Sequence, residues 1–152
     1  LVLACFADLR FAVPGVKFTT AHGKLNLPAE FGLSWLLPRM IPLARANDLL
    51  LSSRVFMSDE AFEMGLVNRL VDPDELMSEA RAYVETMIRT VSPASLATTK
   101  RQIYTDLHRD VGSAVVESEA LVDSMMKQDD YREAVSAFTE KRPPAWRGES
   151  SE

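Results

Sequence analysis

Two side chains early in the chain are suited to proton transfer, His22 and Glu30, which lie eight residues apart. A histidine exchanges protons near neutral pH, and a carboxylate serves as a general acid or base when its surroundings tune it. Glu30 stands in Pro-Ala-Glu-Phe-Gly at the mouth of an expected helix, where the helix dipole also favours a carboxylate. Each residue therefore has two interpretations: a catalytic group, or a helix N-terminal acid for Glu30 and a surface loop residue for His22.

The other reactive residue types form no recognisable site. His108 lies in a polar stretch between two expected helices and is interpreted as a surface or capping residue. Two histidines and one cysteine this far apart lack the spacing of metal ligands, so no metal is expected. Cys5 stands in an apolar segment, which favours a buried small hydrophobic residue over a nucleophile.

Composition restricts the class of protein. The 152 residues suffice for a domain with a core, and their acidic balance, a net charge of -5, argues against a general nucleic-acid binder. The longest apolar runs fall far short of the roughly 20 residues of a membrane span. A single cysteine allows no intrachain disulfide, so a reducing, cytoplasmic location is expected. Because the chain starts with Leu1 inside an apolar segment, we expect the natural N-terminus to lie elsewhere.

Short strands and helices alternate in the first part of the chain. Pro14-Gly15 predicts a turn between two strands, and Ser58-Asp59-Glu60-Ala61 predicts a capping box for a short helix that Gly65 ends. The expected strands are 9–13, 17–20 and 66–71, and the other expected helices are 29–40 and 42–52.

From about residue 72 the pattern is almost entirely helical. Ser92-Pro93 predicts a capped helix with proline at its first position, and the Pro-, Gly- and Ser-bearing tail is expected to fray. The expected helices are 72–90, 93–107, 110–126 and 128–141, and the tail is 142–152. Their wide apolar stripes need a partner, so we expect them to meet another subunit or an absent N-terminal part.

Four stretches resemble one family when taken together and in order. They are 7–12 followed by 17–18, 27–32 leading into 36–39, 58–68, and 138–142, and the third is the most specific. All resemble the crotonase superfamily, also called the enoyl-CoA hydratase/isomerase family, and the resemblance covers nearly the whole chain.

The resemblance implies an α/β fold. Family members form a spiral of ββα units followed by a helical region that builds trimers and hexamers. Residues 1–71 would then be the C-terminal part of the spiral, and residues 72–152 the helical oligomerisation region of a homo-oligomer. The implied substrate is an acyl-CoA thioester, with coenzyme A as part of the substrate and no separate cofactor.

The resemblance also assigns candidate site residues. Family members hold a thioester enolate with two backbone N–H groups, and both would precede Leu1. The two hydratase glutamate positions fall on Val2 and His22, and valine transfers no protons. Glu30 resembles an acid of the dienoyl-CoA isomerase branch, which implies that Glu30 is the acid or base and His22 its partner.

Three further residues are candidates for substrate binding. Trp35 could line an acyl pocket or belong to a plain helix core. Phe138 and Lys141 resemble a family pair that touches the adenine and phosphates of coenzyme A, and the alternative for Lys141 is a solvated residue that caps its helix.

These observations leave three hypotheses. The first is an acyl-CoA enzyme of the enoyl-CoA hydratase/isomerase type, a lyase or isomerase of a non-standard branch that uses Glu30 in enolate chemistry. The second is a non-catalytic crotonase-like scaffold or oligomerisation subunit, motivated by Val2 at a carboxylate position. The third is a truncated product that is stable only with its missing half.

Overall fold

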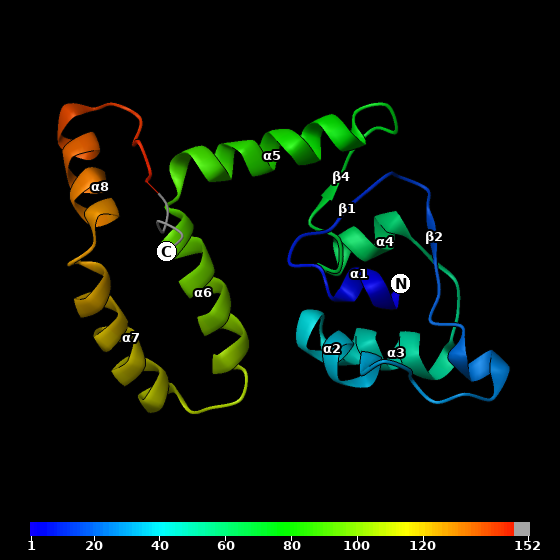
Figure 1. Ribbon diagram of the computed structural model, residues 1–152. Coiled ribbons are helices and arrows are strands. Elements are labelled where there is room, and N and C mark those ends of the chain that lie inside the picture. The colour runs from blue at the N-terminus through cyan, green and yellow to red at the C-terminus, as the bar shows by residue number, and fades with distance from the viewer. Residues whose placement is uncertain (148–152) are drawn as a thin grey trace. The chain divides into compact units, whose positions relative to one another are not determined.

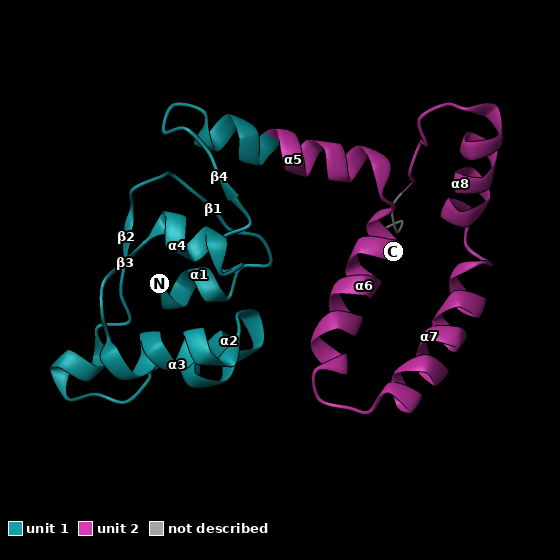
Figure 2. Cartoon of the chain, turned by 180° about the vertical axis from the view of Figure 1, so that it is seen from behind, with its two compact units in different colours: residues 1–81 teal, residues 82–152 magenta. Residues whose placement is uncertain are grey.

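The computed structural model describes residues 1–147. Their contacts divide the chain into two compact units, Leu1–Arg81 and Ala82–Glu152, which Figure 2 colours separately. The division falls within helix α5 (Leu76–Thr90), whose first residues belong to unit 1. Each unit is described below by itself.

Unit 1 is a mixture of short helices and two-residue strands, as expected of an α/β fold. Its helices include two that lie side by side, α2 (Leu33–Met40) and α3 (Leu43–Ser52) (Figure 1). The other elements are α1 (Val2–Cys5), β1 (Phe11–Ala12), β2 (Lys17–Phe18), the 3₁₀ helix η1 (His22–Leu25), β3 (Phe56–Met57), α4 (Ser58–Glu63) and β4 (Arg69–Leu70).

The strands of unit 1 pair with partners that are distant in sequence. β1 runs parallel to β4, with Phe11 opposite Arg69, and β2 runs antiparallel to β3, with Phe18 opposite Phe56. The expected strands around Pro14-Gly15 are confirmed, but they belong to different pairs, so the turn joins two sheets. β3 was not predicted from the sequence, because a strand of two residues has no alternation to detect.

The core of unit 1 lies where α2 and α3 meet the strands. Leu37 and Leu49 are fully buried, and Phe56 of β3 packs its ring 5.7 Å from the Phe18 ring, measured between centroids. Burial of such side chains is the main source of stability for a small unit, at about 1.5–3 kcal/mol for each large aliphatic or aromatic residue.

The predicted capping box is wrong, because Ser58 is used elsewhere. α4 begins at Ser58 itself and no side chain caps it. The buried Ser58 hydroxyl accepts a hydrogen bond from Val16 N at 3.1 Å, and Glu60 pairs with Arg54. The predicted end is confirmed: Gly65 follows α4 with φ +83°, a left-handed conformation that favours glycine.

The described part of unit 2, residues 82–147, contains three whole helices and the end of α5. They are α6 (Pro93–Asp106), α7 (Val111–Met125) and α8 (Asp129–Glu140), which follow one another in Figure 1. The predicted cap at Ser92 is confirmed, since its hydroxyl accepts a hydrogen bond from Ser95 N at 3.4 Å and donates one to Asp130 at 3.1 Å. Asp110 caps α7 in the same way through Ser113 N.

The segment after α8 is not frayed, contrary to the expectation from its composition. Arg142 and the backbone N–H of Ala145 both hydrogen-bond Glu133, at 2.5 and 2.7 Å. Trp146 Nε1 donates to Arg89 O of α5 at 3.2 Å. Polar groups on the neighbouring helices thus anchor 142–147, and the remainder of the expected tail, 148–152, lies outside the described residues.

Within residues 1–147, no helix is both long enough and apolar enough to cross a membrane.

Candidate functional site

The segment from Ala21 to Gly32 carries both proton-transfer candidates and an unusual backbone. Of the described residues other than glycine, five have positive φ, and three of them, Ala21, Asn26 and Phe31, lie in this segment. Such a conformation costs about 1–2 kcal/mol for a residue with a Cβ atom. Strained backbone of this kind clusters at functional sites, where the surrounding structure holds it in place.

His22 is buried, so the interpretation as a surface loop residue is wrong. It begins η1, and its side chain is only 8% exposed. Its Nδ1 atom is buried and has no hydrogen-bond partner among the described residues. A buried polar atom without a partner costs about 1–3 kcal/mol, which calls for an explanation such as a bound ligand.

A hydroxyl group that the sequence did not point to holds this turn in place. Ser53, at the C-terminal end of α3, is 1% exposed, and its Oγ accepts a hydrogen bond from Gly23 N at 3.0 Å. Thr20 Oγ1 lies 3.3 Å from Ser53 Oγ and 3.2 Å from Leu49 O. Because these contacts join residues about thirty positions apart, no local sequence signal reveals them.

Glu30 lies at the opposite end of the segment. It is exposed, and its backbone carbonyl accepts a hydrogen bond from Leu33 N at 2.9 Å as α2 begins. Within residues 1–147, no hydrogen bond or ion pair engages its carboxylate, and none joins it to His22. The structure therefore places the two candidates on one strained segment, with the carboxylate open to a ligand, but does not bond them to each other.

Trp35 occupies the first turn of α2 and is half-buried. The Arg39 guanidinium carbon lies 4.0 Å from the centroid of its ring, and Arg39 Nη1 donates to Trp35 O at 3.0 Å. The Arg39 guanidinium thus lies over one face of the Trp35 ring, and the two groups attract each other electrostatically.

Phe138 and Lys141 belong to unit 2, apart from the other candidates. Phe138 of α8 is 88% exposed. Lys141 is exposed and ends the helix with φ +54°, so it does cap α8 as the alternative interpretation holds, while its ammonium group stays accessible.

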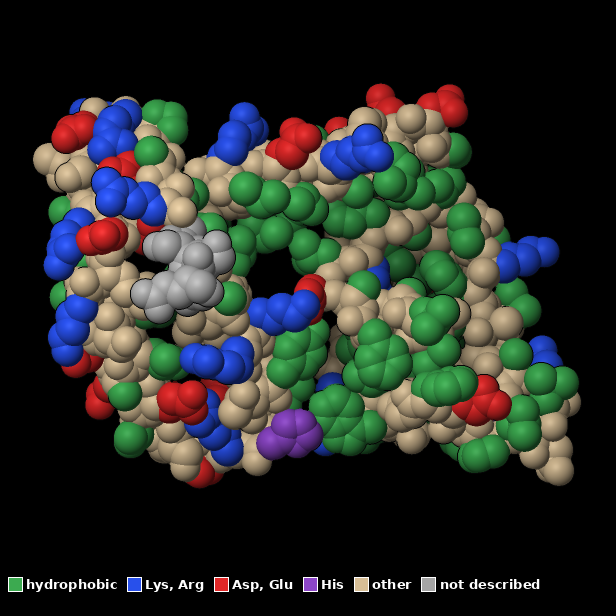
Figure 3. All heavy atoms as spheres, viewed as in Figure 1, with side chains coloured by type: hydrophobic (Ala, Val, Ile, Leu, Met, Phe, Trp, Pro, Cys, Tyr) green, Lys and Arg blue, Asp and Glu red, His purple; other side chains and the backbone are tan. Residues whose placement is uncertain are grey.

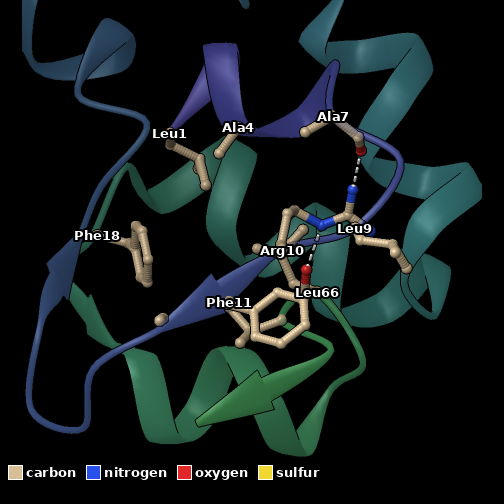
Figure 4. Close-up of a pocket in the computed structure, with 10 residues that line it drawn as sticks. Leu1, Ala4, Ala7, Leu9, Arg10, Phe11, Phe18 and Leu66 are labelled. Atoms are coloured by element: carbon tan, nitrogen blue, oxygen red, sulfur yellow. Dashed lines mark hydrogen bonds between the residues drawn. The ribbon is translucent and has the colours of Figure 1, made fainter. Parts of the chain in front are cut away.

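A cavity of about 250 Å³ lies in unit 1, away from the predicted residues. It is mostly apolar, and Figure 4 shows how Arg10 borders it: Arg10 Nε donates to Leu66 O at 2.5 Å, and its Nη1 to Ala7 O. The cavity is lined by Leu1, Ala4, Ala7, Leu9, Arg10, Phe11, Ala12, Phe18, Leu66 and Val67.

Cys5 is buried in the core, as its apolar context predicted. Burial raises the pKa of the Cys5 thiol, which keeps it protonated and unreactive. Among residues 1–147, no group of three His, Cys, Asp or Glu side chains could hold a metal ion.

Comparison with curated proteins finds relatives that act on acyl-CoA thioesters. The chain is 33% identical over 148 residues to (E)-benzylidenesuccinyl-CoA hydratase of Thauera aromatica. The matched region covers 97% of this chain and 57% of the relative. It is 30% identical over 150 residues to carnitinyl-CoA dehydratase of Salmonella arizonae, covering 96% and 57%. The chain thus spans a little over half the length of these relatives.

Solved structures give the same result for the fold. An enoyl-CoA hydratase from Mycobacterium tuberculosis superposes with a TM-score of 0.90 at 31% identity, over 96% of this chain and 57% of that one. An enoyl-CoA hydratase from Mycobacterium smegmatis superposes with a TM-score of 0.86 at 28% identity, over 95% and 55%. The family model "Enoyl-CoA hydratase/isomerase" matches residues 1–149, and the chain therefore belongs to the enoyl-CoA hydratase/isomerase family, the crotonase superfamily.

Proposed function

We propose that the protein containing this chain moves a proton next to the carbonyl of an acyl-CoA thioester, with Glu30 as the acid or base and His22 as its partner. The observation that carries the proposal is the buried, unpartnered Nδ1 of His22. The family resemblance implies that this position corresponds to a hydratase glutamate. A substrate group would satisfy that nitrogen. The curated relatives named above are a hydratase and a dehydratase of acyl-CoA compounds, which supports the substrate class.

The geometry of Glu30 supports the same role. Its carboxylate is exposed and unengaged by the described residues, so it can hold a water molecule or take a proton. Phe31 and Gly32, the next two residues, have φ +50° and +72°. This left-handed pair separates Glu30 from the first turn of α2, which supports a role for the carboxylate other than helix capping.

The exposed apolar surface supports assembly with further polypeptide. Figure 3 shows hydrophobic side chains gathered over unit 1 and along α5. In a complete protein, such side chains are covered by other parts of the chain or by neighbouring subunits, and we propose a homo-oligomer, a trimer or hexamer. Among the most exposed are Leu3, Phe6 and Phe31 in unit 1, and Val111, Val116 and Phe138 in unit 2.

Exchange of the substrate α-proton tests the proposal most directly. The whole protein is incubated with a saturated or an unsaturated acyl-CoA, such as butyryl-CoA or crotonyl-CoA, in deuterated water, and deuterium uptake is followed by mass spectrometry. Replacing a general acid or base lowers such rates by about 10²- to 10⁴-fold, which is the loss expected for Glu30→Gln and His22→Gln. The matched control is Glu63→Gln, at an exposed glutamate of α4 in the same unit.

The control should keep the wild-type exchange rate. If Glu30→Gln also exchanges at the wild-type rate, Glu30 has no part in the chemistry. Hydration of crotonyl-CoA, measured in parallel, separates a hydratase from an isomerase, because only the former adds water.

A second candidate function is a non-catalytic crotonase-like subunit. Val2 favours it, because the family resemblance implies a hydratase glutamate at this position and valine cannot transfer protons. Absence of α-proton exchange by the wild-type protein with every acyl-CoA tried, together with retained assembly, would support this function over the first.

A further inference from the structure

The buried serine at the end of α3 has a feature that the proposed chemistry does not use. Ser53 adopts φ +47°, a conformation that glycine prefers and that costs a serine about 1–2 kcal/mol. A glycine would relieve this cost but would lack the hydroxyl. The hydroxyl is therefore the group that distinguishes serine here, and it accepts hydrogen bonds from Thr20 Oγ1 and Gly23 N, on either side of His22.

The residue that faces Ser53 is complementary to it. Gly23 donates its N–H to Ser53 Oγ at 3.0 Å, and a Cβ atom built on Gly23 would lie 2.7 Å from the same oxygen. Since real Cβ atoms do not approach this closely, the hydroxyl fills the space that any other residue at 23 would need. The Ser53 hydroxyl thus requires a glycine at position 23, and the glycine leaves room for the hydroxyl.

Several contacts extend this pair to His22. Thr19 Oγ1 donates to Ser53 O at 3.3 Å, and Ala21 N donates to Thr19 Oγ1 at 3.1 Å. The backbone N–H groups on both sides of His22, those of Ala21 and Gly23, are therefore tied directly or through one hydroxyl to Ser53.

We infer that Ser53 is a positioning residue for His22, with Gly23 as its obligatory neighbour. The serine hydroxyl fixes the turn on the end of α3 and so holds the His22 imidazole in its buried place. This inference rests on the proposed role of His22 in proton transfer. It assigns to residues 23 and 53 a contribution to catalysis without contact with the substrate.

The experiment measures the placement of His22 and the turnover separately. Diethyl pyrocarbonate modifies accessible, unprotonated histidines, and peptide mass spectrometry reports His22 and His108 individually, so the exposed His108 is an internal reference. The variants are Ser53→Gly, which suits the left-handed backbone and should fold, Gly23→Ala, and the two combined. Ser52→Ala, at the exposed neighbouring serine, is the control.

We expect Ser53→Gly to raise the modification rate of His22 relative to His108 about tenfold, because the turn opens more often. The α-proton exchange rate constant should fall about tenfold or more with KM changed less than twofold, since misplaced catalytic groups affect the reacting geometry rather than substrate binding. Gly23→Ala should behave likewise. The combined variant should match Ser53→Gly, because the clash partner is gone.

Other outcomes distinguish the inference from the proposed function. If Ser53→Gly matches Ser52→Ala in both measurements, or lowers exchange without changing His22 modification, Ser53 is not a positioning residue. If His22 modification rises while exchange is unchanged, Ser53 does place His22, and the proposed catalytic role of His22 fails instead.

Discussion

The Arg142 guanidinium donates two hydrogen bonds to the Glu133 carboxylate, from Nη1 to Oε1 at 2.5 Å and from Nη2 to Oε2 at 3.1 Å. This bidentate pair lowers the pKa of Glu133 from its ordinary value of 4.5 to about 2, with a further contribution from the Ala145 N–H. The pair joins α8 to the segment 142–147 and makes the attachment of that segment sensitive to acid.

The sign of the acid response follows from the lowered pKa. A carboxylate whose pKa is lowered in the folded state contributes its full stabilisation when the pH is above the ordinary pKa of 4.5. The contribution of Glu133 to the attachment of residues 142–147 is lost as the pH falls towards about 2. We expect Trp146 fluorescence to change between pH 4.5 and 2 in a Trp35→Phe background, where Trp146 is the only tryptophan. Glu133→Gln should show the acid spectrum already at neutral pH.

The control for this titration is Glu119→Gln, at an exposed glutamate of α7. It should leave the Trp146 transition where it is in the parent. A transition that persists unchanged in Glu133→Gln would show that another group attaches the segment.

Asn68 bonds across the chain to Arg10. Its Oδ1 accepts from Arg10 N at 2.7 Å, next to the β1–β4 pair. Asn68→Ala should lower the free energy of unfolding of unit 1 by about 1 kcal/mol, as expected for one hydrogen bond. Asn68→Asp keeps the accepting oxygen and should lose less free energy of unfolding. Chemical denaturation of the two variants therefore distinguishes the effect of the hydrogen bond from the effect of side-chain volume.

Leu37 is a fully buried residue of α2. Leu37→Ala removes three carbon atoms from the core and should lower the free energy of unfolding by about 2–5 kcal/mol, measured by urea titration. Leu51→Ala on α3 is the matched control, because Leu51 is 85% exposed and should change little. Equal losses in the two variants would contradict the assigned core.

Lys141 offers a test of coenzyme A binding. If its ammonium group meets a phosphate, Lys141→Asn should raise KM for an acyl-CoA about tenfold and leave kcat unchanged, because a charge-assisted bond is lost in ground and transition state alike. Asparagine tolerates the left-handed backbone at this position. Lys127→Ala, in the same unit, is the control and should leave KM unchanged. An unchanged KM in Lys141→Asn would show that the lysine only caps α8.

The sequence was most informative where local chemistry decides the structure. Ser92-Pro93 predicted the start of its helix because capping depends on a few neighbouring residues. Gly65 announced the end of α4 for the same reason. Each of these signals depends on residues within a few positions of the helix end.

Long-range partners explain what the sequence did not reveal. Ser58 looked like a cap, but Val16 competes for its hydroxyl from 42 positions away. Composition predicted a frayed tail, yet Glu133 and Arg89 bind residues 142–146 of it. Ser53 has no local signal in the sequence, and only the fold shows that it faces Gly23. The roles of Glu30 and His22 remain predictions, since they depend on a substrate.

The parallel pairing of β1 with β4 has a consequence for the order in which the protein is made. The hydrogen bond between Arg10 and Asn68 cannot form until Asn68, 58 positions later in the chain, has been synthesised. Closing so long a loop before any gain in contacts slows folding. On a ribosome that adds about 5–20 residues per second, β1 would therefore remain without its partner strand for several seconds.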